Sequence, residues 1–292
     1  MKKNMLSVAV ISVLMFVASI VVAVPASAED LTWVGCGISK KAFMSALASE
    51  YEKKTGVHID LQGGGATRGI RDVASGKADI GGSCRHVLRN PEEKNANLEH
   101  VAWDALVVIT NPDNPVSDIN ISDLKAVFEG GITNWKDLGG PDMPIKVVAR
   151  KGNTSGVGLM ARELLFKDPQ KEFTSRAVYL KSSGPLEKMI EKERGAIGIS
   201  GVSSAKKSDV KMLSINGKTP THENIASGAY ILYRPLYLVT SRTPSEKVRS
   251  FIRFAKSEEG QAIISDQGTV NLKDGSALWQ PYNNSMKQVR GK

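Results

Sequence analysis

Three short segments of this sequence have residue types suited to binding an anion. The first is the glycine run at residues 63–65, followed by Ala66 and Thr67 at the head of an apolar-periodic stretch. A helix that begins there presents free backbone N–H groups and the positive end of its dipole to any nearby anion. Glycines also simply mark turns. One such segment therefore indicates little until others are considered with it.

The second and third segments carry side-chain donors beside similar small residues. Residues 81–83 (Gly-Gly-Ser) are predicted to form a turn that carries Cys84 and Arg85, and Arg150 precedes the small polar run at residues 152–156. An arginine, hydroxyl groups and free amides together suit a tetrahedral oxyanion, because each of its oxygens accepts several hydrogen bonds. The sequence thus favours an oxyanion site.

The elements around these segments alternate between strand and helix. We expect strands at 31–34 and 57–61 with a helix at about 39–54 between them, and a further short strand at 78–80. This order predicts a parallel sheet with right-handed crossovers, which is an α/β fold. Ligands of such sheets lie at the carboxyl ends of the strands, where the glycine-rich turns fall.

The rest of the chain repeats this pattern less regularly. A strand region at 98–110 leads to a turn cluster at 111–115, which is a candidate crossing point between two lobes. Pro235 interrupts the apolar segment at 230–240, so we expect that segment not to be a central strand. A strand at 145–149, helices at about 157–166, 185–192 and 245–261, and a polar, irregular stretch over the last thirty or so residues complete the prediction.

Length and charge restrict the class of protein. The 292 residues suit two lobes better than one core. The formal net charge of +9 agrees with an anionic ligand, an anionic surface, or solubility alone. Nucleic acid is not expected as a partner, because the lysines are scattered singly and only 6% of the residues are aromatic.

The amino-terminal residues resemble an export signal. Lys2 and Lys3 precede an apolar run from residue 5 to 24, and the segment ends in small residues up to Ala28. This pattern is typical of a secretory signal peptide cleaved after Ala28, and it predicts an exported protein. An uncleaved membrane anchor is the alternative, since roughly 20 apolar residues span a bilayer.

Beyond this segment the chain has two cysteines, Cys36 and Cys84. In an exported protein such a pair most often forms one disulfide, so the two residues are a disulfide candidate. The cysteines lack metal-binding spacing and the four histidines are scattered. We therefore expect neither a metal site nor a cofactor.

Several motifs occur in the order found in one known family. They are the loop at residues 35–39, the glycines at 63–65 with the segment 76–81, the segment 131–140 (GITNWKDLGG), Arg150 with residues 155–156, the segment 195–198 (GAIG) and the segment 234–240 (RPLYLVT). With these motifs the chain resembles the periplasmic phosphate-binding proteins, which are the substrate-binding components of ABC importers.

The resemblance implies an architecture and a mechanism. It implies an α/β fold of the type II periplasmic binding proteins, with two lobes, a hinge and a ligand cleft between the lobes. Residues 29–110 with about 230–292 would form lobe 1, and residues of about 111–229 would form lobe 2. The lobes would close on a dehydrated oxyanion, and the chain would be a monomer that delivers its ligand to an ABC transporter permease.

The resemblance also implies a set of ligand contacts, transferred motif by motif. These candidate ligand-binding residues are Gly37, Ile38, Ser39, Ala66, Thr67, Ser83, Cys84, Arg85, Arg150, Thr154, Ser155 and Gly156.

Two departures from the family pattern leave the ligand open. Family members that select phosphate often have an aspartate where Cys84 stands, and the family's Ser-Gly-Thr has Val157 as its third residue here. Phosphate is the main hypothesis. The alternative is an arsenate or arsenite sensor that signals to a membrane histidine kinase, because a free thiol would face the oxyanion.

An enzyme is not expected. Cys84 and His86 would be the candidates for a nucleophile and its base, but the sequence places no carboxylate to orient the histidine. We therefore predict a binding protein without catalytic residues.

Overall fold

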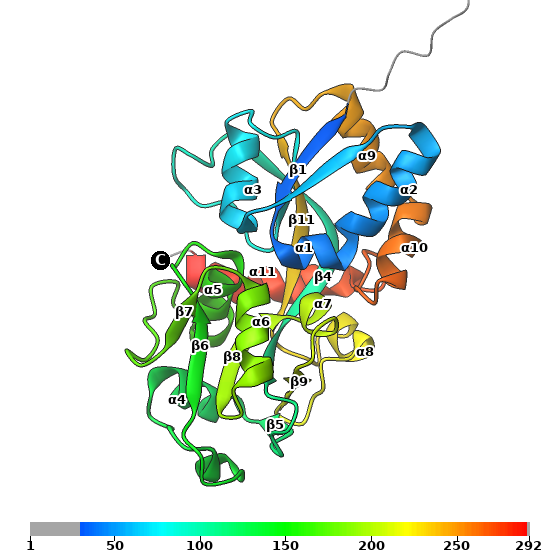
Figure 1. Ribbon diagram of the computed structural model, residues 1–292. Helices are drawn as coiled ribbons and strands as arrows, with labels where there is room; N and C mark the ends of the chain where they lie inside the picture. Colours follow the sequence, from blue (N-terminus) through cyan, green and yellow to red (C-terminus); the bar gives the residue numbers. More distant parts are fainter. Residues whose placement is uncertain (1–29, 291–292) are drawn as a thin grey trace, which may run out of the picture.

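The computed structural model describes residues 30–290, so the expected signal peptide at residues 1–28 lies outside the described residues. Figure 1 shows two α/β lobes, with strands β4 (Ala96–Thr110) and β11 (Tyr233–Ser241) passing between them. The predicted α/β class and its two-lobed architecture are confirmed. None of the helices in residues 30–290 is both long enough and apolar enough to span a bilayer.

One mixed sheet runs through both lobes. In the described part of the chain it has nine strands in the order β2-β1-β3-β11-β4-β8-β6-β7, with β9 paired to β4, while β5 and β10 form a separate pair. The remaining strands are β1 Leu31–Gly35, β2 Ile59–Gly63, β3 Ile80–Ser83, β5 Asp118–Ile119, β6 Lys146–Arg150, β7 Val178–Leu180, β8 Ala196–Gly201, β9 Lys211–Met212 and β10 Ser214–Ile215.

Helices cover the sheet in both lobes. Those of the upper lobe in Figure 1 are α1 Gly37–Ser39, η1 Lys40–Met44, α2 Ser45–Thr55, α3 Gly65–Ala74, α9 Glu246–Lys256 and α10 Glu258–Asp266. The others are α4 Ile121–Glu129, η2 Trp135–Leu138, α5 Gly156–Ala161, η3 Arg162–Phe166, α6 Ser183–Lys192, α7 Val202–Ala205, α8 His222–Ala226, η4 Ser276–Leu278 and α11 Trp279–Arg290.

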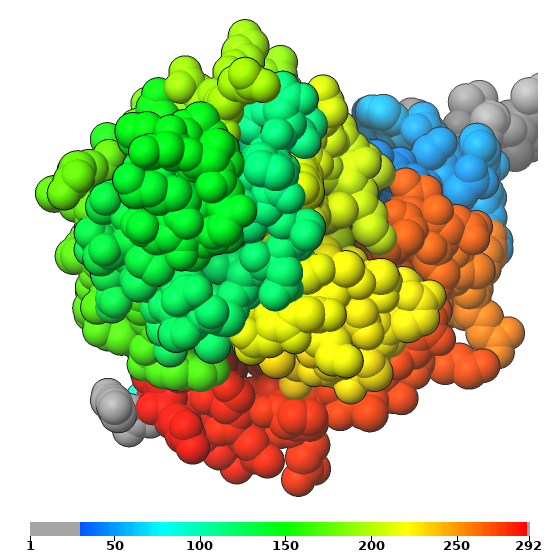
Figure 2. All heavy atoms as spheres, turned by 90° about the horizontal axis from the view of Figure 1, so that it is seen from below, coloured from blue at the N-terminus to red at the C-terminus, as the bar shows by residue number. Residues whose placement is uncertain are grey.

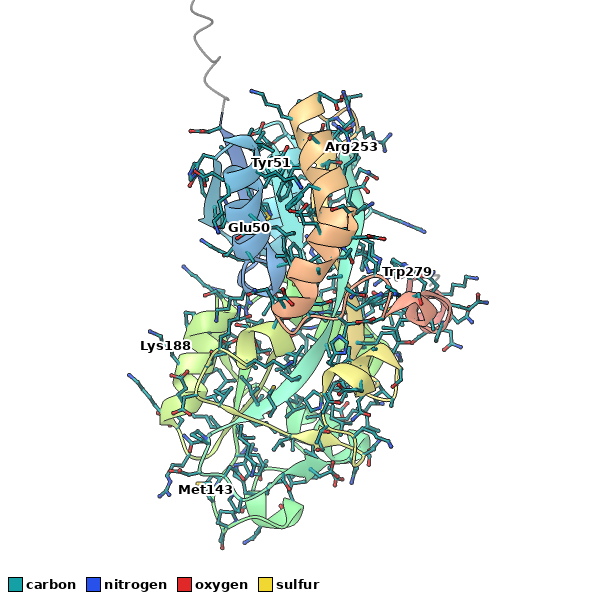
Figure 3. The ribbon with its side chains drawn as sticks, turned by 90° about the vertical axis from the view of Figure 1, so that its right-hand side faces the viewer. Glu50, Tyr51, Met143, Lys188, Arg253 and Trp279 are labelled. Carbon is teal, nitrogen blue, oxygen red and sulfur yellow. The ribbon has the colours of Figure 1, made fainter. Side chains whose placement is uncertain are left out.

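The first three strands form the predicted parallel arrangement. β1 pairs with β2 on one side and with β3 on the other, both in parallel. The helical run from α1 through α2 connects β1 to β2 and ends at Gly56, whose φ of 73° is the left-handed conformation that glycine tolerates best. In Figure 3, Tyr51 of this run lies beside α9, where its ring packs edge-on against Phe251 at 5.2 Å.

The glycines at residues 81–82 do not form the predicted turn but belong to strand β3. Their lack of a side chain serves packing instead. A Cβ on Gly81 would lie 2.5 Å from the carbonyl oxygen of Gly69 in α3, and one on Gly82 would overlap the ring of Trp33. The two glycines therefore let α3 and Trp33 lie close to the sheet.

Strand β4 connects the two lobes by changing its neighbour. It pairs with β11 as far as Ala105, and from Leu106 to Thr110 it pairs with β8. The exchange of neighbours thus occurs inside the strand, upstream of the turn at 111–115 that the sequence suggested. The side chain of Asn111 donates to the carbonyls of residues 190 and 191 at the end of α6, which fixes that turn to the lower lobe.

Pro235 was expected to keep its segment out of the sheet centre, and this expectation is wrong. Strand β11 lies between β3 and β4. Pro235 faces Trp103 of β4, whereas pairing with β3 begins only at Tyr237, after a bulge. The proline therefore lies where the strand has a neighbour on one side only, so its missing N–H removes no bond to β3.

The carboxyl terminus was expected to be irregular, but it forms helix α11. Its buried side chains are Tyr282, Met286 and Val289. The helix lies at the junction of the two lobes, and Figure 2 shows it as a red band beneath the green and yellow segments. Most residues of this helix are polar. The three buried apolar residues are spaced three or four apart and form a narrow stripe, which the polar composition does not reveal.

Candidate functional site

A cavity of about 510 Å³ lies between the lobes. Helices α1 and α3 reach it from the upper lobe, and α5 and α6 from the lower (Figure 1). Its lining residues are Cys36, Gly37, Ile38, Lys41, Gly63, Gly64, Gly65, Ala66, Cys84, Arg150, Gly156, Val157, Lys181, Ser182, Ser183, Gly184 and Ser204.

The upper lobe contributes the start of α3. Strand β2 ends at Gly63, and α3 begins at Gly65, whose φ of 86° favours glycine. The first two residues of this ten-residue helix, Gly65 and Ala66, line the cavity. Because the first N–H groups of a helix have no partner within the helix, this end of α3 offers amide donors to an anion.

The lower lobe contributes a buried arginine. Arg150 ends strand β6, and its guanidinium donates to the hydroxyl of Ser183 at 3.0 Å and to the carbonyl of Lys181 at 2.6 Å. Burial lowers the pKa of this guanidinium from its usual value. An arginine nevertheless stays charged in proteins, so Arg150 brings a fixed positive charge to the cavity wall.

Sequence reasoning missed several lining residues of the lower lobe. Ser182, Ser183 and Gly184 follow strand β7 and lie at the start of helix α6. They show the same pattern of small residues at a helix start that marked the other predicted segments. That signal was present in the sequence. Lys41 had no such signal, because it lies inside a helical run and reaches the cavity only in the folded chain.

Arg85, a predicted ligand contact, does not line the cavity. Its guanidinium forms two bonds with the carboxylate of Glu93, at 2.9 and 2.8 Å, and both side chains are fully buried. Arg85 also donates to the carbonyl of Thr154 at 2.8 Å and to the hydroxyl of Thr67, which itself donates to Thr154. These three predicted ligand residues therefore join the upper lobe to the lower lobe.

The three predicted serines also lie outside the lining. Ser39 hydrogen-bonds the sulfur of Cys36, Ser83 donates to the carbonyl of Arg85, and Ser155 caps helix α5. Of the twelve predicted contacts, the residues that line the cavity are Gly37, Ile38, Ala66, Cys84, Arg150 and Gly156. Their contacts with a ligand stay predictions.

The disulfide hypothesis does not match the structure, in which Cys36 and Cys84 are buried free thiols. Burial by itself raises the pKa of Cys36, but hydrogen bonds from Cys84 and Ser39 outweigh it and lower that pKa. The same hydrogen bond to Cys36, together with burial, raises the pKa of Cys84 well above its usual value. The two pKa values therefore shift in opposite directions, that of Cys36 downward and that of Cys84 upward.

A buried ion pair lies behind the two sulfurs. Arg234 bonds Asp104 at 3.0 Å, and neither side chain is exposed. The hydroxyl and the amide of Ser203 satisfy the other oxygen of Asp104. Although burial opposes charge on Arg234, the neighbouring acidic groups raise the pKa of its guanidinium, so a positive charge persists beside the thiol pair.

His86 has the carboxylate partner that the sequence did not reveal. Its Nε2 lies 2.8 Å from Glu163 of the lower lobe, and Arg290 of α11 bonds the second oxygen of that carboxylate at 2.8 Å. Burial favours a raised pKa for Glu163, but these two hydrogen bonds lower it. His86 is not part of the cavity lining, so the cluster joins the lobes outside the cavity.

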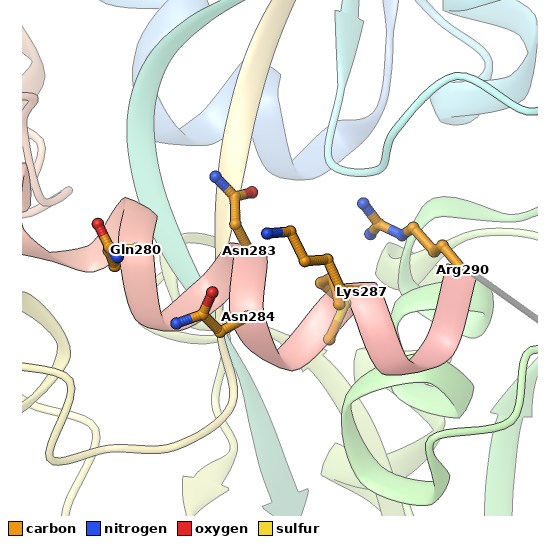
Figure 4. A pocket seen from close by; sticks show the side chains of 6 residues that line it. Gln280, Asn283, Asn284, Lys287 and Arg290 are labelled. Carbon is orange, nitrogen blue, oxygen red and sulfur yellow. The ribbon is translucent and has the colours of Figure 1, made fainter.

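A second hollow, shown in Figure 4, has a different character. Its lining residues all belong to α11, with Asn283, Lys287 and Arg290 among them. No second element converges on it in the part of the chain described. Residues 30–290 also hold no group of three or more His, Cys, Asp or Glu side chains arranged for a metal ion.

The fold and the cavity define a two-lobed binding protein of the type II periplasmic class. A family model described as a PBP superfamily domain matches residues 24–259. The phosphate-binding protein PstS of Borreliella burgdorferi is 30% identical over 256 residues, covering 84% of this chain and 91% of that relative. The chain belongs to this phosphate-binding protein family within the PBP superfamily.

Solved structures agree with this assignment. A putative phosphate ABC transporter substrate-binding protein from Clostridium perfringens, solved with bound phosphate, has a TM-score of 0.75 and 29% identity, covering 83% of this chain and 99% of its own. An ABC-type phosphate transport receptor from Vibrio cholerae has a TM-score of 0.65 and 28% identity, covering 82% of this chain and 99% of its own.

Proposed function

We propose that this chain binds inorganic phosphate outside the cytoplasm and delivers it to an ABC transporter permease. The observation that carries the proposal is the interlobe cavity. Arg150 and Lys181 line it together with the start of α3 and with Lys41, which also pairs with Glu187 at 3.4 Å, while its lining includes no carboxylate. Positive charge and free amides in a partly dehydrated site favour a dianion. The relatives named for phosphate binding support the same ligand.

Closure of the lobes is the proposed mechanism of capture. Strands β4 and β11 are the connections about which the lobes would turn, and contacts such as Lys41 to Ser204 at 2.9 Å join the lobes beside the cavity. Phosphate would favour the closed form only as far as it binds that form more tightly than the open one.

The remaining parts of the proposal concern location and assembly. We expect export to the periplasm with cleavage after Ala28, a monomer, and no catalytic activity. Lobe 1 would comprise residues 29–110 and about 230–292, and lobe 2 about 111–229, with the exchange between Ala105 and Leu106 inside β4. The arsenate or arsenite sensor is not favoured, because the relatives are named for phosphate.

The test is calorimetric titration of the anion-free chain with phosphate, with reductant present. We expect wild-type protein to bind phosphate and Arg150→Ala to bind it about 10- to 100-fold more weakly, because charge-assisted hydrogen bonds are lost. Arg253→Ala, at an exposed surface ion pair, is the control and should match wild type. Thermal unfolding of each variant checks that it is folded. Absence of phosphate binding by the wild-type chain would contradict the proposal.

A further inference from the structure

A buried carboxylate lies next to the wall of the cavity. The side chain of Glu187 is only 1% exposed, and its two oxygens accept from the hydroxyls of Ser200 at 2.5 Å and Ser208 at 2.8 Å. Ser183 and Gly184, one turn earlier in α6, line the cavity. The two hydroxyls supply hydrogen bonds but leave the charge of the carboxylate uncompensated. A cavity proposed to hold an anion therefore has an anion of the chain close behind its wall.

The cation that pairs with Glu187 belongs to the other lobe. Lys41 lies in η1 of the upper lobe, and its ammonium group is 3.4 Å from Glu187 and donates to the hydroxyl of Ser204 at 2.9 Å. Within residues 30–290 it is the one basic side chain at ion-pair distance from that carboxylate. Lys207 of the lower lobe also donates to the backbone carbonyl of Lys41 at 2.7 Å. Lys41 is therefore bonded across the lobe junction through its side chain and its backbone.

The placement of these groups makes their pairing depend on closure of the lobes. Helix α1, which leads into η1, lies against α6 and α7 at the lobe junction (Figure 1). Lys41 would move with the upper lobe, whereas Glu187 and Ser204 would move with the lower lobe. A carboxylate that is buried without a cation costs free energy, and more so beside a second anion. The closed form therefore needs the charge of Lys41 at this position.

We propose that Lys41 neutralises Glu187 when the lobes close, so that phosphate is held in a cavity with no uncompensated negative charge behind its wall. Glu187 is then a positioning residue, because its carboxylate holds the ammonium group of Lys41 at the cavity wall. The proposal rests on the proposed function, because it concerns closure around the same ligand.

The experiment is a double-mutant cycle, read by calorimetric titration with inorganic phosphate. We expect Lys41→Met to weaken phosphate binding by about tenfold or more, because the closed form then holds Glu187 without its cation. Glu187→Gln alone should weaken binding less than Lys41→Met does, since its amide oxygen still accepts from Lys41. In the combined variant Lys41→Met with Glu187→Gln, much of the lost affinity should return, because no unpaired carboxylate remains.

Lys181 provides the matched control cycle, because it also lines the cavity but is not the cation that pairs with Glu187. The effects of Lys181→Met and Glu187→Gln should add, so that Glu187→Gln does not specifically restore affinity there. Lys41→Arg, which keeps the positive charge, should retain more affinity than Lys41→Met. Melting of each ligand-free variant checks the fold, and Lys41→Gln replaces Lys41→Met in the cycle if the methionine variant does not fold.

Three results would overturn the proposal. Lys41→Met could bind phosphate as tightly as wild type does, or the combined variant could bind it no better than Lys41→Met, which would leave Lys41 with a direct effect on the ligand alone. Equal recovery in the Lys181 cycle would show that the charge of Glu187 acts generally and is not paired with Lys41. A wild-type chain that does not bind phosphate would instead overturn the proposed function.

Discussion

At the scale of single residues, the partner of a side chain decides its role. Arg85 and Arg150 both looked like oxyanion ligands because each lies near a small-residue segment. Glu93 neutralises Arg85 inside the upper lobe, whereas Arg150 bonds only neutral oxygens and keeps its charge for the cavity. Arg85 is therefore a weaker ligand candidate than Arg150, because a buried carboxylate already pairs with it.

Gly156 gives a prediction at this scale. An alanine there should weaken phosphate binding about tenfold or more, because its Cβ would overlap the sulfur of Cys84 and lie 3.0 Å from Ala66, both across the lobe junction. The thermal stability of the ligand-free chain should change little, since an open form relieves the overlap. Calorimetry and melting curves measure the two effects.

The matched variant is Gly131→Ala, also in the lower lobe, where an added Cβ would meet its nearest neighbours at ordinary distances of 3.6 Å or more. It should bind phosphate as wild type does. Equal affinity in Gly156→Ala and wild type would show that the lobes do not close to the spacing seen here.

At the scale of elements, helix α11 stabilises the strand that crosses between the lobes. Trp279 packs against Trp103 of β4 at 4.9 Å and against His100 at 4.6 Å. In Figure 3 Trp279 lies at the level where the lobes meet. The helix thus supports β4 close to the point where the strand changes its neighbour.

The acid stability of this contact is a second prediction. Burial lowers the pKa of His100 from 6.5 to about 4. The unfolded chain binds a proton at this histidine more readily than the folded chain does. The contribution of neutral, buried His100 to the free energy of unfolding is therefore complete above about pH 6.5 and is lost as pH falls toward about 4. The full effect is about 3 kcal/mol at most.

Denaturant unfolding between pH 7 and pH 4 measures the slope. His100→Gln should give a shallower loss of unfolding free energy over that range than wild type. His58→Gln is the control, because His58 is exposed and its pKa is raised by Glu52, which gives the opposite sign. Parallel slopes for His100→Gln and wild type would contradict the prediction.

At the scale of the whole molecule, polar contacts between the lobes set how readily the cavity closes. Glu163 of the lower lobe joins His86 of the upper lobe to Arg290 of α11. Its carboxylate is only 2% exposed, whereas its two partners are 20% and 28% exposed. Both partners are thus open to water, whereas the carboxylate depends on them for its hydrogen bonds, so we expect Glu163 to favour the closed form.

Glu163→Gln should therefore weaken phosphate binding several-fold, because the closed form becomes a smaller fraction of the molecules. Small-angle scattering should show that the ligand-free variant is more extended than ligand-free wild type or equal to it, and that both contract with phosphate. Glu50→Gln, at an exposed position on α2, is the control. If Glu163→Gln binds phosphate with the same affinity as wild type, the cluster contributes to folding but not to closure of the lobes.

The sequence by itself determined the α/β class, the two lobes and the helix starts that face the cavity. Glycine runs and hydrophobic periodicity are local signals, and the residues 63–66, Arg150 and Gly156 that they singled out line the cavity. These signals were misleading at residues 81–82, where glycines predicted a turn but allow close packing within a strand. They were also misleading in α11, where a narrow apolar stripe in a polar segment did not indicate a helix.

Only the tertiary structure decided which predicted residues face the cavity and which join the lobes. The pairing of Glu163 with His86 and of Lys41 with Ser204 joins residues of different lobes, and Arg85 pairs with Glu93 in a turn eight residues further along the chain. The pKa directions of the two thiols likewise depend on burial and on the hydrogen bond between Cys36 and Cys84. Such contacts leave no periodic trace in the sequence, because they depend on how the two lobes come together.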